Sequence, residues 1–239
     1  MIERHLLKLR ARDTVSPEEE QAIRDSIAEV RDLPADTVIV HAGRLLSFSV
    51  LLLEGLLCRY KDLSDGQRQI TELHVPGDFA DLHSFTLKRL DHNIMTITPC
   101  RVAIVPHEKL EDITERFPHL TRLYWFTTNM DAAIHREWEV SLGRRTAVSR
   151  IAALFCEMKL RLEVVGLTEG PSYEFDITQT DLAECVGLTP IHVNRTLKEL
   201  RERRLVQFRS GRVTINDWDG LATVAEFDPA YLYLGKLPL

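Results

Sequence analysis

Residues 177–215 read ITQTDLAECVGLTPIHVNRTLKELRERRLVQFRSGRVTI, and this stretch decides the fold prediction for the C-terminal part of the chain. Thr178 is a residue type that caps helix N-termini, because its hydroxyl accepts from a free backbone N–H group of the first turn. Gly187 supplies the positive φ that a sharp helix exit needs. Thr189 and Pro190 give a second start signal, since Pro lacks the N–H that the first helical position leaves unbonded. The pattern predicts two short helices joined by a tight turn.

The second predicted helix has one apolar and one polar face. Val193, Leu197 and Leu200 recur at spacings of four and three, which places them on the face turned toward the first helix. Two alternating segments, Leu205–Phe208 and Arg212–Ile215, then flank a Gly-containing turn and predict a hairpin. Two helices followed by such a hairpin form a winged helix-turn-helix, in which the start of the second helix enters the major groove of DNA.

The residues that we predict to contact DNA lie at both helix starts, on the polar face and in the wing. They are Thr178, Gln179, Thr189, Pro190, Ile191, His192, Asn194, Arg195, Lys198 and Arg209. The whole chain has 30 Lys and Arg against 36 Asp and Glu, whereas residues 189–213 hold seven against two, a local charge of +5. Cations concentrate in this way where a protein neutralises phosphates. The alternative is a solvated helix face on a winged domain that binds a protein partner.

Residues 38–105 have a different sequence pattern, with short β-rich segments separated by Gly and Pro. The segments are Val38–His41, Leu45–Leu53, Gly55–Tyr60, Gln69–Val75, Asn93–Thr98 and Arg101–Val105. Many short strands at such spacing predict an antiparallel barrel or sandwich. Ahead of it, Ser16-Pro17 followed by three Glu predicts a short amphipathic helix over about residues 17–30.

Helical patterns return after Pro106. A short helix is predicted over about residues 107–116, followed by one long helix with an apolar stripe. We predict that this stripe is the seam of a dimer, with ordinary core packing as the alternative. The seam residues are Leu123, Phe126, Met130, Ile134 and Trp138. Gly143-Arg144-Arg145 is the predicted hinge, and a further helix is expected over about residues 146–164.

These patterns predict an α+β fold: an N-terminal antiparallel, jelly-roll-like β-roll over residues 1–117, a dimerisation helix over 118–142 and a winged helix-turn-helix over 143–239. No apolar run approaches the roughly 20 residues that span a bilayer, and the N-terminus lacks a signal-peptide pattern. We therefore expect a cytoplasmic protein without a membrane partner. No nucleophile–base set and no phosphate-cradling glycine loop is visible, so enzyme activity is not expected.

The four cysteines argue against a metal centre. Cys58, Cys100, Cys156 and Cys185 lie far apart in sequence and form no CxxC pair. We expect them to be reduced and buried.

The order of β-roll, long helix and winged helix-turn-helix resembles the Crp/Fnr superfamily of bacterial transcription regulators, over about residues 30–218. PGDF at residues 76–79 resembles the family's turn at the entrance to its effector site, and LAECVGLTPIHVNRTLKEL at residues 182–200 resembles its helix-turn-helix signature. The resemblance implies a homodimer that binds a two-fold-symmetric operator in double-stranded DNA. It also implies contact with RNA polymerase and control by a signal sensed through the β-roll.

The chain departs from the family's effector motifs. Cyclic-nucleotide binders have a Gly-Glu-Leu segment and an Arg-Ser or Arg-Thr pair, where this chain has Ala80-Asp81-Leu82-His83 and Arg89-Leu90-Asp91-His92. A phosphate facing Asp91 would be repelled, which argues against cyclic AMP. Oxygen sensors of the family hold an iron–sulfur cluster through N-terminal cysteines, and this chain has no Cys before Cys58. We therefore expect no cofactor.

The recognition helix departs as well. Ile191 stands where many relatives have a Glu that accepts from cytosine, and it can offer only apolar contact, for instance to a thymine methyl group. Arg195 retains the position at which the family reads guanine.

Polar residues near the PGDF turn form a candidate effector pocket. They are Gly77, Asp78, Asp81, His83, Arg89, Asp91 and His92. The same carboxylates and imidazoles leave open a metal or haem site, or a plain polar loop surface. Three rival functions therefore stay open: an effector-independent regulator controlled by abundance, a metal-dependent enzyme and a protein-binding signalling module.

Overall fold

The computed structural model describes residues 1–237, which fall into two compact units. The first unit comprises residues 1–61, 72–132 and 234–237 of the described chain, and the second comprises residues 62–71 and 133–233. The boundary between the two units falls inside the long helix Pro118–Arg144, after residue 132.

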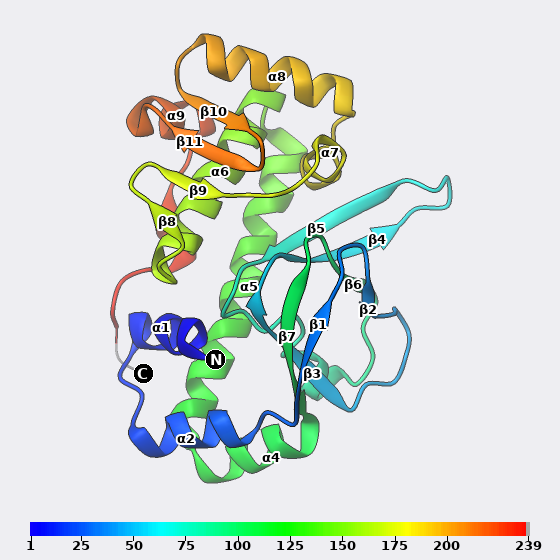
Figure 1. The fold of residues 1–239 in the computed structure, drawn as a ribbon, viewed down its shortest axis with the longest axis vertical. Helices are drawn as coiled ribbons and strands as arrows, with labels where there is room; N and C mark the ends of the chain where they lie inside the picture. The colour runs from blue at the N-terminus through cyan, green and yellow to red at the C-terminus, as the bar shows by residue number, and fades with distance from the viewer. Residues whose placement is uncertain (238–239) are drawn as a thin grey trace. The chain divides into compact units, whose positions relative to one another are not determined.

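The first unit contains the predicted antiparallel roll (Figure 1), built from two sheets. One sheet has the order β1-β7-β3 and the other has the order β2-β6-β4-β5. The strands are β1 Glu29–Leu33, β2 Val38–Val40, β3 Phe48–Glu54, β4 Leu57–Asp62, β5 Arg68–His74, β6 Asn93–Thr96 and β7 Cys100–Pro106. All six predicted segments contain a strand, whereas β1 begins inside the range predicted to be helix.

Strands β3 and β7 are buried on both faces, which explains their nearly continuous apolar sequences. Successive side chains of a strand point to opposite faces. Val50 and Leu52 of β3 therefore face the core inside the roll. Leu51 and Leu53 face a second core, which lies between this sheet and a layer of helices. The β1-β7-β3 sheet thus lies between the interior of the roll and the layer of helices.

The helix layer of the first unit is built from both ends of its sequence. Its second core contains apolar residues of α1 Glu3–Arg12, α2 Pro17–Asp25, α4 His107–Arg116 and α5 Pro118–Arg144. A one-turn helix, α3 Ser84–Leu87, follows the PGDF turn. The capping box predicted for α2 is present, because the Ser16 hydroxyl accepts from Glu19 N and the Glu19 carboxylate accepts from Ser16 N. Helix α1 was not predicted.

The second unit contains the winged helix-turn-helix. Its elements after α5 are α6 Ala147–Val164, β8 Thr168–Glu169, β9 Ser172–Glu174, α7 Gln179–Val186, α8 Pro190–Glu202, β10 Val206–Arg209, β11 Arg212–Ile215, α9 Trp218–Ala225 and the 3-10 helix η1 Pro229–Leu232. Helix α5 continues through Gly143 and ends at Arg144, and Thr146 caps α6. The predicted hinge is therefore shorter than expected, and two of its three residues are helical.

Within residues 1–237, no helix is both long enough and apolar enough to cross a membrane.

Candidate nucleic-acid interface

Capping interactions fix the two helices of the motif. At the start of α7, the Thr178 hydroxyl accepts from Asp181 N at 3.1 Å, and the Asp181 carboxylate accepts from Thr178 N at 2.8 Å. Gly187 ends this helix with φ 61°, in the left-handed region. At the start of α8, the Thr189 hydroxyl accepts from His192 N at 3.3 Å. The turn between α7 and α8 therefore has the two caps and the left-handed glycine from which it was predicted.

Helix α8 is strictly two-sided. Val193, Thr196 and Leu200 are buried against the rest of the unit. The opposite side exposes Asn194, Arg195 and Lys198, together with Ile191 near the helix start. The exposed side of α8 is therefore the one predicted to enter a groove of DNA.

The structure brings together predicted DNA contacts from both helices. Asn194 of α8 donates to the Gln179 side chain at the start of α7, with 3.4 Å between the nitrogen and the oxygen. Of the ten predicted residues, only His192 is half-buried, and the others are exposed. The side chains of Thr178 and Thr189 are engaged in capping, so their role in the structure is to position the helices.

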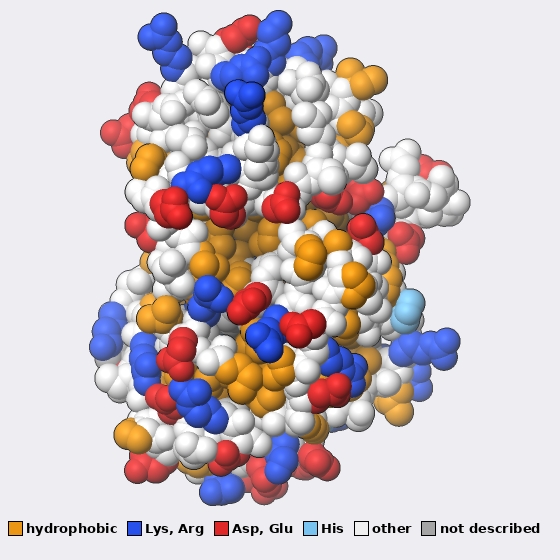
Figure 2. All heavy atoms as spheres, viewed as in Figure 1, with side chains coloured by type: hydrophobic (Ala, Val, Ile, Leu, Met, Phe, Trp, Pro, Cys, Tyr) orange, Lys and Arg blue, Asp and Glu red, His pale blue; other side chains and the backbone are white. Residues whose placement is uncertain are grey.

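Cations gather on this part of the second unit. Figure 2 shows Lys and Arg side chains over the end of the unit that carries α8. Within the described chain, Arg195, Arg201, Arg204 and Arg209 have no ion pair, whereas Arg203 and Lys198 pair with Glu199 and Glu202, and Arg212 pairs with Glu169 and Glu174. Four of the five net positive charges are therefore guanidinium groups without an ion pair, and the fifth belongs to Arg212, whose partners lie outside residues 189–213.

The hairpin wing has the expected tight turn. Arg209 and Arg212 pair across β10 and β11, and the two residues between them, Ser210 and Gly211, have φ of 51° and 72°. Positive φ at both positions is the two-residue hairpin geometry that fits strand twist. Arg209 is therefore held at the end of the wing, next to the turn.

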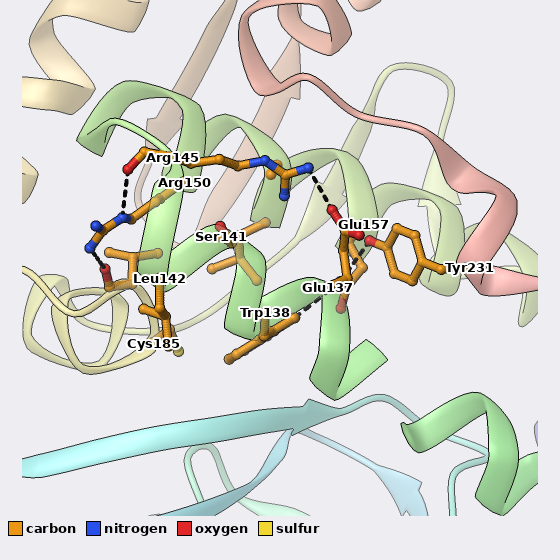
Figure 3. A pocket seen from close by; sticks show the side chains of 12 residues that line it. Glu137, Trp138, Ser141, Leu142, Arg145, Arg150, Glu157, Cys185 and Tyr231 are labelled. Carbon is orange, nitrogen blue, oxygen red and sulfur yellow. Dashed lines mark hydrogen bonds and ion pairs between the residues drawn. The ribbon is translucent and has the colours of Figure 1, made fainter. Parts of the chain in front are cut away.

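A buried network fastens the junction of α5 and α6 (Figure 3). It surrounds a cavity of about 20 Å³, room for about one water molecule. Glu157 of α6 accepts from Trp138 of α5 at 3.0 Å, from Tyr231 of η1 at 2.8 Å and from Arg161 at 2.9 Å. Burial raises the pKa of Glu157. This carboxylate therefore joins three elements of the second unit.

The same junction is joined to α7. Arg150 of α6 donates to the backbone oxygens of Arg145 at 3.0 Å and of Val186 at 3.1 Å (Figure 3). Val186 is the last residue of α7, whose final carbonyl groups lack partners inside the helix. Arg150 thus ties the end of α7 to the segment between α5 and α6.

The predicted effector pocket separates into two groups of residues. Gly77, Asp78 and Asp81 are buried, and each is engaged within the chain. The Gly77 oxygen accepts from His5 Nδ1 of α1 at 2.8 Å, Asp78 pairs with Lys8, and Asp81 Oδ1 accepts from Val50 N at 2.6 Å.

The other group lies on and beside the surface. Arg89 is exposed and donates to the Gly43 oxygen at 2.7 Å. Asp91 pairs with Lys61 at 2.6 Å and with His92 at 2.9 Å, and the rings of His92 and His83 are 5.5 Å apart. The seven residues therefore divide into a group engaged with α1 and β3 and a group at or near the surface, and their role as an effector pocket stays a prediction.

Sequence reasoning missed a buried charge cluster in the roll. Arg59 of β4 donates through Nε to the Ala80 oxygen at 2.7 Å, and its two amino groups donate to Glu72 at 2.5 Å and to Asp131 of α5 at 2.9 Å. Burial raises the pKa of Asp81 to about 7. Burial and the neighbouring Glu72 raise the pKa of Asp131 to about 6. A signal was available, because Arg59 and Glu72 occupy inward positions of strands.

The dimer seam needs correction. Leu123 and Ile134 are 0% and 1% exposed within the single chain, and Trp138 donates to Glu157. Phe126 and Met130 are half-buried. The stripe is therefore mostly intrachain core, the alternative reading of its spacing, and the exposed side of α5 carries other residues.

No cluster of three or more His, Cys, Asp or Glu in residues 1–237 is arranged to hold a metal ion. All four cysteines are buried, as expected from the sequence.

The architecture and the motifs can be compared with known proteins. Residues 30–117 match the model of the cyclic nucleotide-binding domain, and residues 149–224 match that of the Crp-like helix-turn-helix domain. The structure of FixK2 from Bradyrhizobium japonicum superposes with a TM-score of 0.75 at 24% identity, over 83% of this chain and 97% of that one.

Two similar curated proteins are named as transcription activators. Transcriptional activator protein FnrL of Cereibacter sphaeroides is 26% identical over 88% of this chain and 86% of its own length. Transcriptional activatory protein AadR of Rhodopseudomonas palustris is 31% identical over 72% of each chain. With the two-sided α8, its caps and the two matched domains, these relatives show that the chain is a DNA-binding transcription regulator and belongs to the Crp/Fnr family.

Proposed function

We propose that this regulator acts in the cytoplasm as a homodimer that binds a two-fold-symmetric operator through the start of α8. The carrying observation is that α8 exposes the guanidinium of Arg195, which has no ion pair among the described residues, within the first two turns after the capped helix start. Arg in the major groove donates in bidentate fashion to guanine O6 and N7. Asn194 and His192 would then tune the neighbouring base, and Arg209 of the wing would contact phosphate. No catalytic step is part of this proposal.

The dimer seam that we now propose uses the exposed side of α5. Trp125 is 67% exposed, and Asn129 and Ala132 follow it at spacings of four and three. Such a stripe repeats on one helix face and suits pairing with a second copy of the helix. Sedimentation equilibrium of the full chain, with Trp125→Ala as the seam variant, tests the dimer directly.

The signal would reach DNA through the α5–α6 junction. A change in the roll that moves α5 would act on the Glu157 network and on the Arg150 contact to the end of α7. The distance between the two recognition helices of the dimer would then change. Binding to half-sites one helical turn apart requires these helices to be about 34–36 Å from each other. Contact with RNA polymerase would follow in an activator, as the names of the relatives suggest.

The nature of the signal has two candidates. Neither cyclic AMP nor an iron–sulfur cluster is part of our proposal, because the phosphate motif is altered and no Cys precedes Cys58. The second candidate is a regulator controlled by abundance alone. It is favoured by one observation in the roll. All three nitrogens of the buried Arg59 guanidinium already donate to acceptors of the chain itself. Thermal shifts of the full chain with cell metabolite fractions separate the two candidates.

Selection from random duplex DNA tests the regulator itself. The full chain should enrich an inverted repeat whose half-sites lie about one helical turn apart. Enrichment of a single, unrepeated site would contradict the symmetric dimer. The absence of any enriched sequence, with and without metabolite fractions, would overturn the proposed function.

A further inference from the structure

Ile191 of α8 is unusually exposed for a large apolar residue. Its exposed fraction is 85%, the highest for any large apolar side chain of residues 1–237. A single exposed aliphatic side chain is ordinary on a protein surface. What sets Ile191 apart is its place, the second residue of the helix that Thr189 and Pro190 begin.

The start of α8 cannot turn this side chain inward. Val193 and Leu200 are fully buried and fix which side of the helix faces the core. The cap at Thr189 fixes the first turn, so the Ile191 side chain keeps its outward direction. Being β-branched, it is also stiff at χ1. An apolar surface is thus held rigidly on the exposed face of the recognition helix.

The neighbours of Ile191 on this face are polar. Arg195 follows one turn later, and Lys198 lies one turn beyond that. Residues four apart on a helix are neighbours on its surface. Any groove that receives the guanidinium of Arg195 therefore receives the Ile191 side chain as well.

We propose that Ile191 is a specificity-determining residue that reads the 5-methyl group of thymine in the major groove. This inference rests on the proposed function and adds a second base to it. Thymine is the base that presents a methyl group in that groove, whereas cytosine presents an amino donor and guanine two acceptors. An aliphatic side chain has no partner for those polar groups, and leaving them desolvated is unfavourable.

The helix geometry places the thymine relative to the guanine read by Arg195. Four residues of α-helix rise about 6 Å. Successive base pairs are separated by about 3.4 Å. The thymine is therefore expected about two base steps from the guanine, once in each half-site.

Deoxyuridine substitution in the selected operator tests this reading, because it removes the methyl group and nothing else. The full chain should lose about fourfold in affinity for one substituted half-site, the usual effect of losing one buried methyl-sized apolar group. Two substituted half-sites should cost about sixteenfold. Ile191→Ala should bind the thymine operator more weakly and no longer distinguish it from the deoxyuridine operator.

Two further variants make the test selective. Ile191→Glu should move the selected base toward cytosine, since a carboxylate accepts from its amino group. Leu87→Ala removes an aliphatic side chain that is 62% exposed in the first unit, and should leave the deoxyuridine effect unchanged. Ile191→Ala should also keep the wild-type salt dependence, because no phosphate contact is lost.

The inference fails if the wild-type chain binds deoxyuridine and thymine operators equally at every half-site position. It also fails if Ile191→Ala retains the wild-type preference for the methyl group. Either outcome leaves an enriched inverted repeat in place and so spares the proposed function. If the wild-type chain enriches no DNA sequence, the proposed function itself fails.

Discussion

Arginine serves two opposite purposes in the roll and in the recognition helix. Arg59 lies inside the roll, 2% exposed, and donates to three acceptors of its own chain. Arg195 lies on α8, exposed and without an ion pair among the described residues. A buried guanidinium must be compensated inside the fold, whereas an exposed one stays available to another molecule. The guanidinium of Arg59 therefore stabilises the roll from within, whereas that of Arg195 stays available for binding to another molecule.

The roll and α8 should also differ in their sensitivity to pH and to salt. The roll buries Glu72, Asp81 and Asp131 near Arg59, so protons influence its stability. The cations of α8 are exposed, so salt should influence their interactions instead. Stability as a function of pH and affinity as a function of salt therefore separate the two regions.

The largest expected effect comes from removing Arg59. Arg59→Ala leaves the carboxylate of Glu72 buried without its cation, a change that typically destabilises a protein by about 3–5 kcal/mol. The free energy of unfolding of the roll, measured by urea denaturation and circular dichroism, should fall accordingly. Lys61→Ala is the matched control, because Lys61 pairs with Asp91 at the surface and should matter little. Equal effects of the two variants would break the contrast between buried and exposed charge.

The second prediction concerns the pH dependence that Asp81 gives to the roll. Its pKa is raised from 3.8 to about 7, so the folded chain keeps a proton that the unfolded chain has released. The stabilisation is complete below about pH 4 and is lost as pH rises through about 7. Asp81→Asn removes this dependence, so its stability relative to wild type should improve between pH 5 and pH 8 by about 3 kcal/mol, since about two pH units of that window lie below the folded pKa.

The control for this titration is Glu20→Gln. Arg24 and Arg10 hold the pKa of Glu20 below its usual range, so that carboxyl stays ionised from pH 5 to pH 8. Its substitution should have the same effect at both pH values. A flat pH profile for Asp81→Asn relative to wild type would show that Asp81 does not titrate in this range.

On the other side of the comparison, Arg195→Ala should weaken binding to the selected operator by about 1–3 kcal/mol. Affinity for random duplex DNA should fall much less, because a base contact is lost rather than a phosphate contact. Arg209→Ala in the wing is the control, since it should weaken both affinities alike and reduce the salt dependence. Gel-shift titrations with both kinds of DNA measure the difference. Equal losses for both DNAs with Arg195→Ala would show that Arg195 contacts phosphate.

The helix-turn-helix was predictable from sequence because its signals are local. Thr178, Gly187 and Thr189 act on backbone groups within a few residues, and the structure has the caps and the positive φ that these types favour. The roll's strands were predictable for a similar reason, since alternation and Gly or Pro punctuation are local patterns.

The effector pocket and the dimer seam depend on contacts between residues far apart in the sequence. The structure separates the predicted pocket residues and buries Leu123, Ile134 and Trp138 of the predicted seam within the chain. The partners of Asp78 and Gly77 lie in α1, about seventy residues away in sequence. The residues near the PGDF turn do not indicate these contacts. An apolar stripe at helical spacing looks the same in a chain's own core and in a seam, so Leu123 and Ile134 could not be assigned from periodicity. Helix α1 itself was missed because its cap residue, Ile2, makes no side-chain capping bond.

The smallest expected effect distinguishes a positioning residue from a DNA contact within α7 itself. Thr178→Ala removes one cap and should destabilise the second unit by about 1 kcal/mol. Ser16→Ala removes the corresponding cap of α2 and should cost the first unit a similar amount. Because the Thr178 hydroxyl is occupied by Asp181, operator affinity of the folded Thr178→Ala chain should stay near wild type in gel shifts. A loss of affinity larger than the loss of stability would mean that Thr178 contacts DNA, and the cap would then be only part of its role.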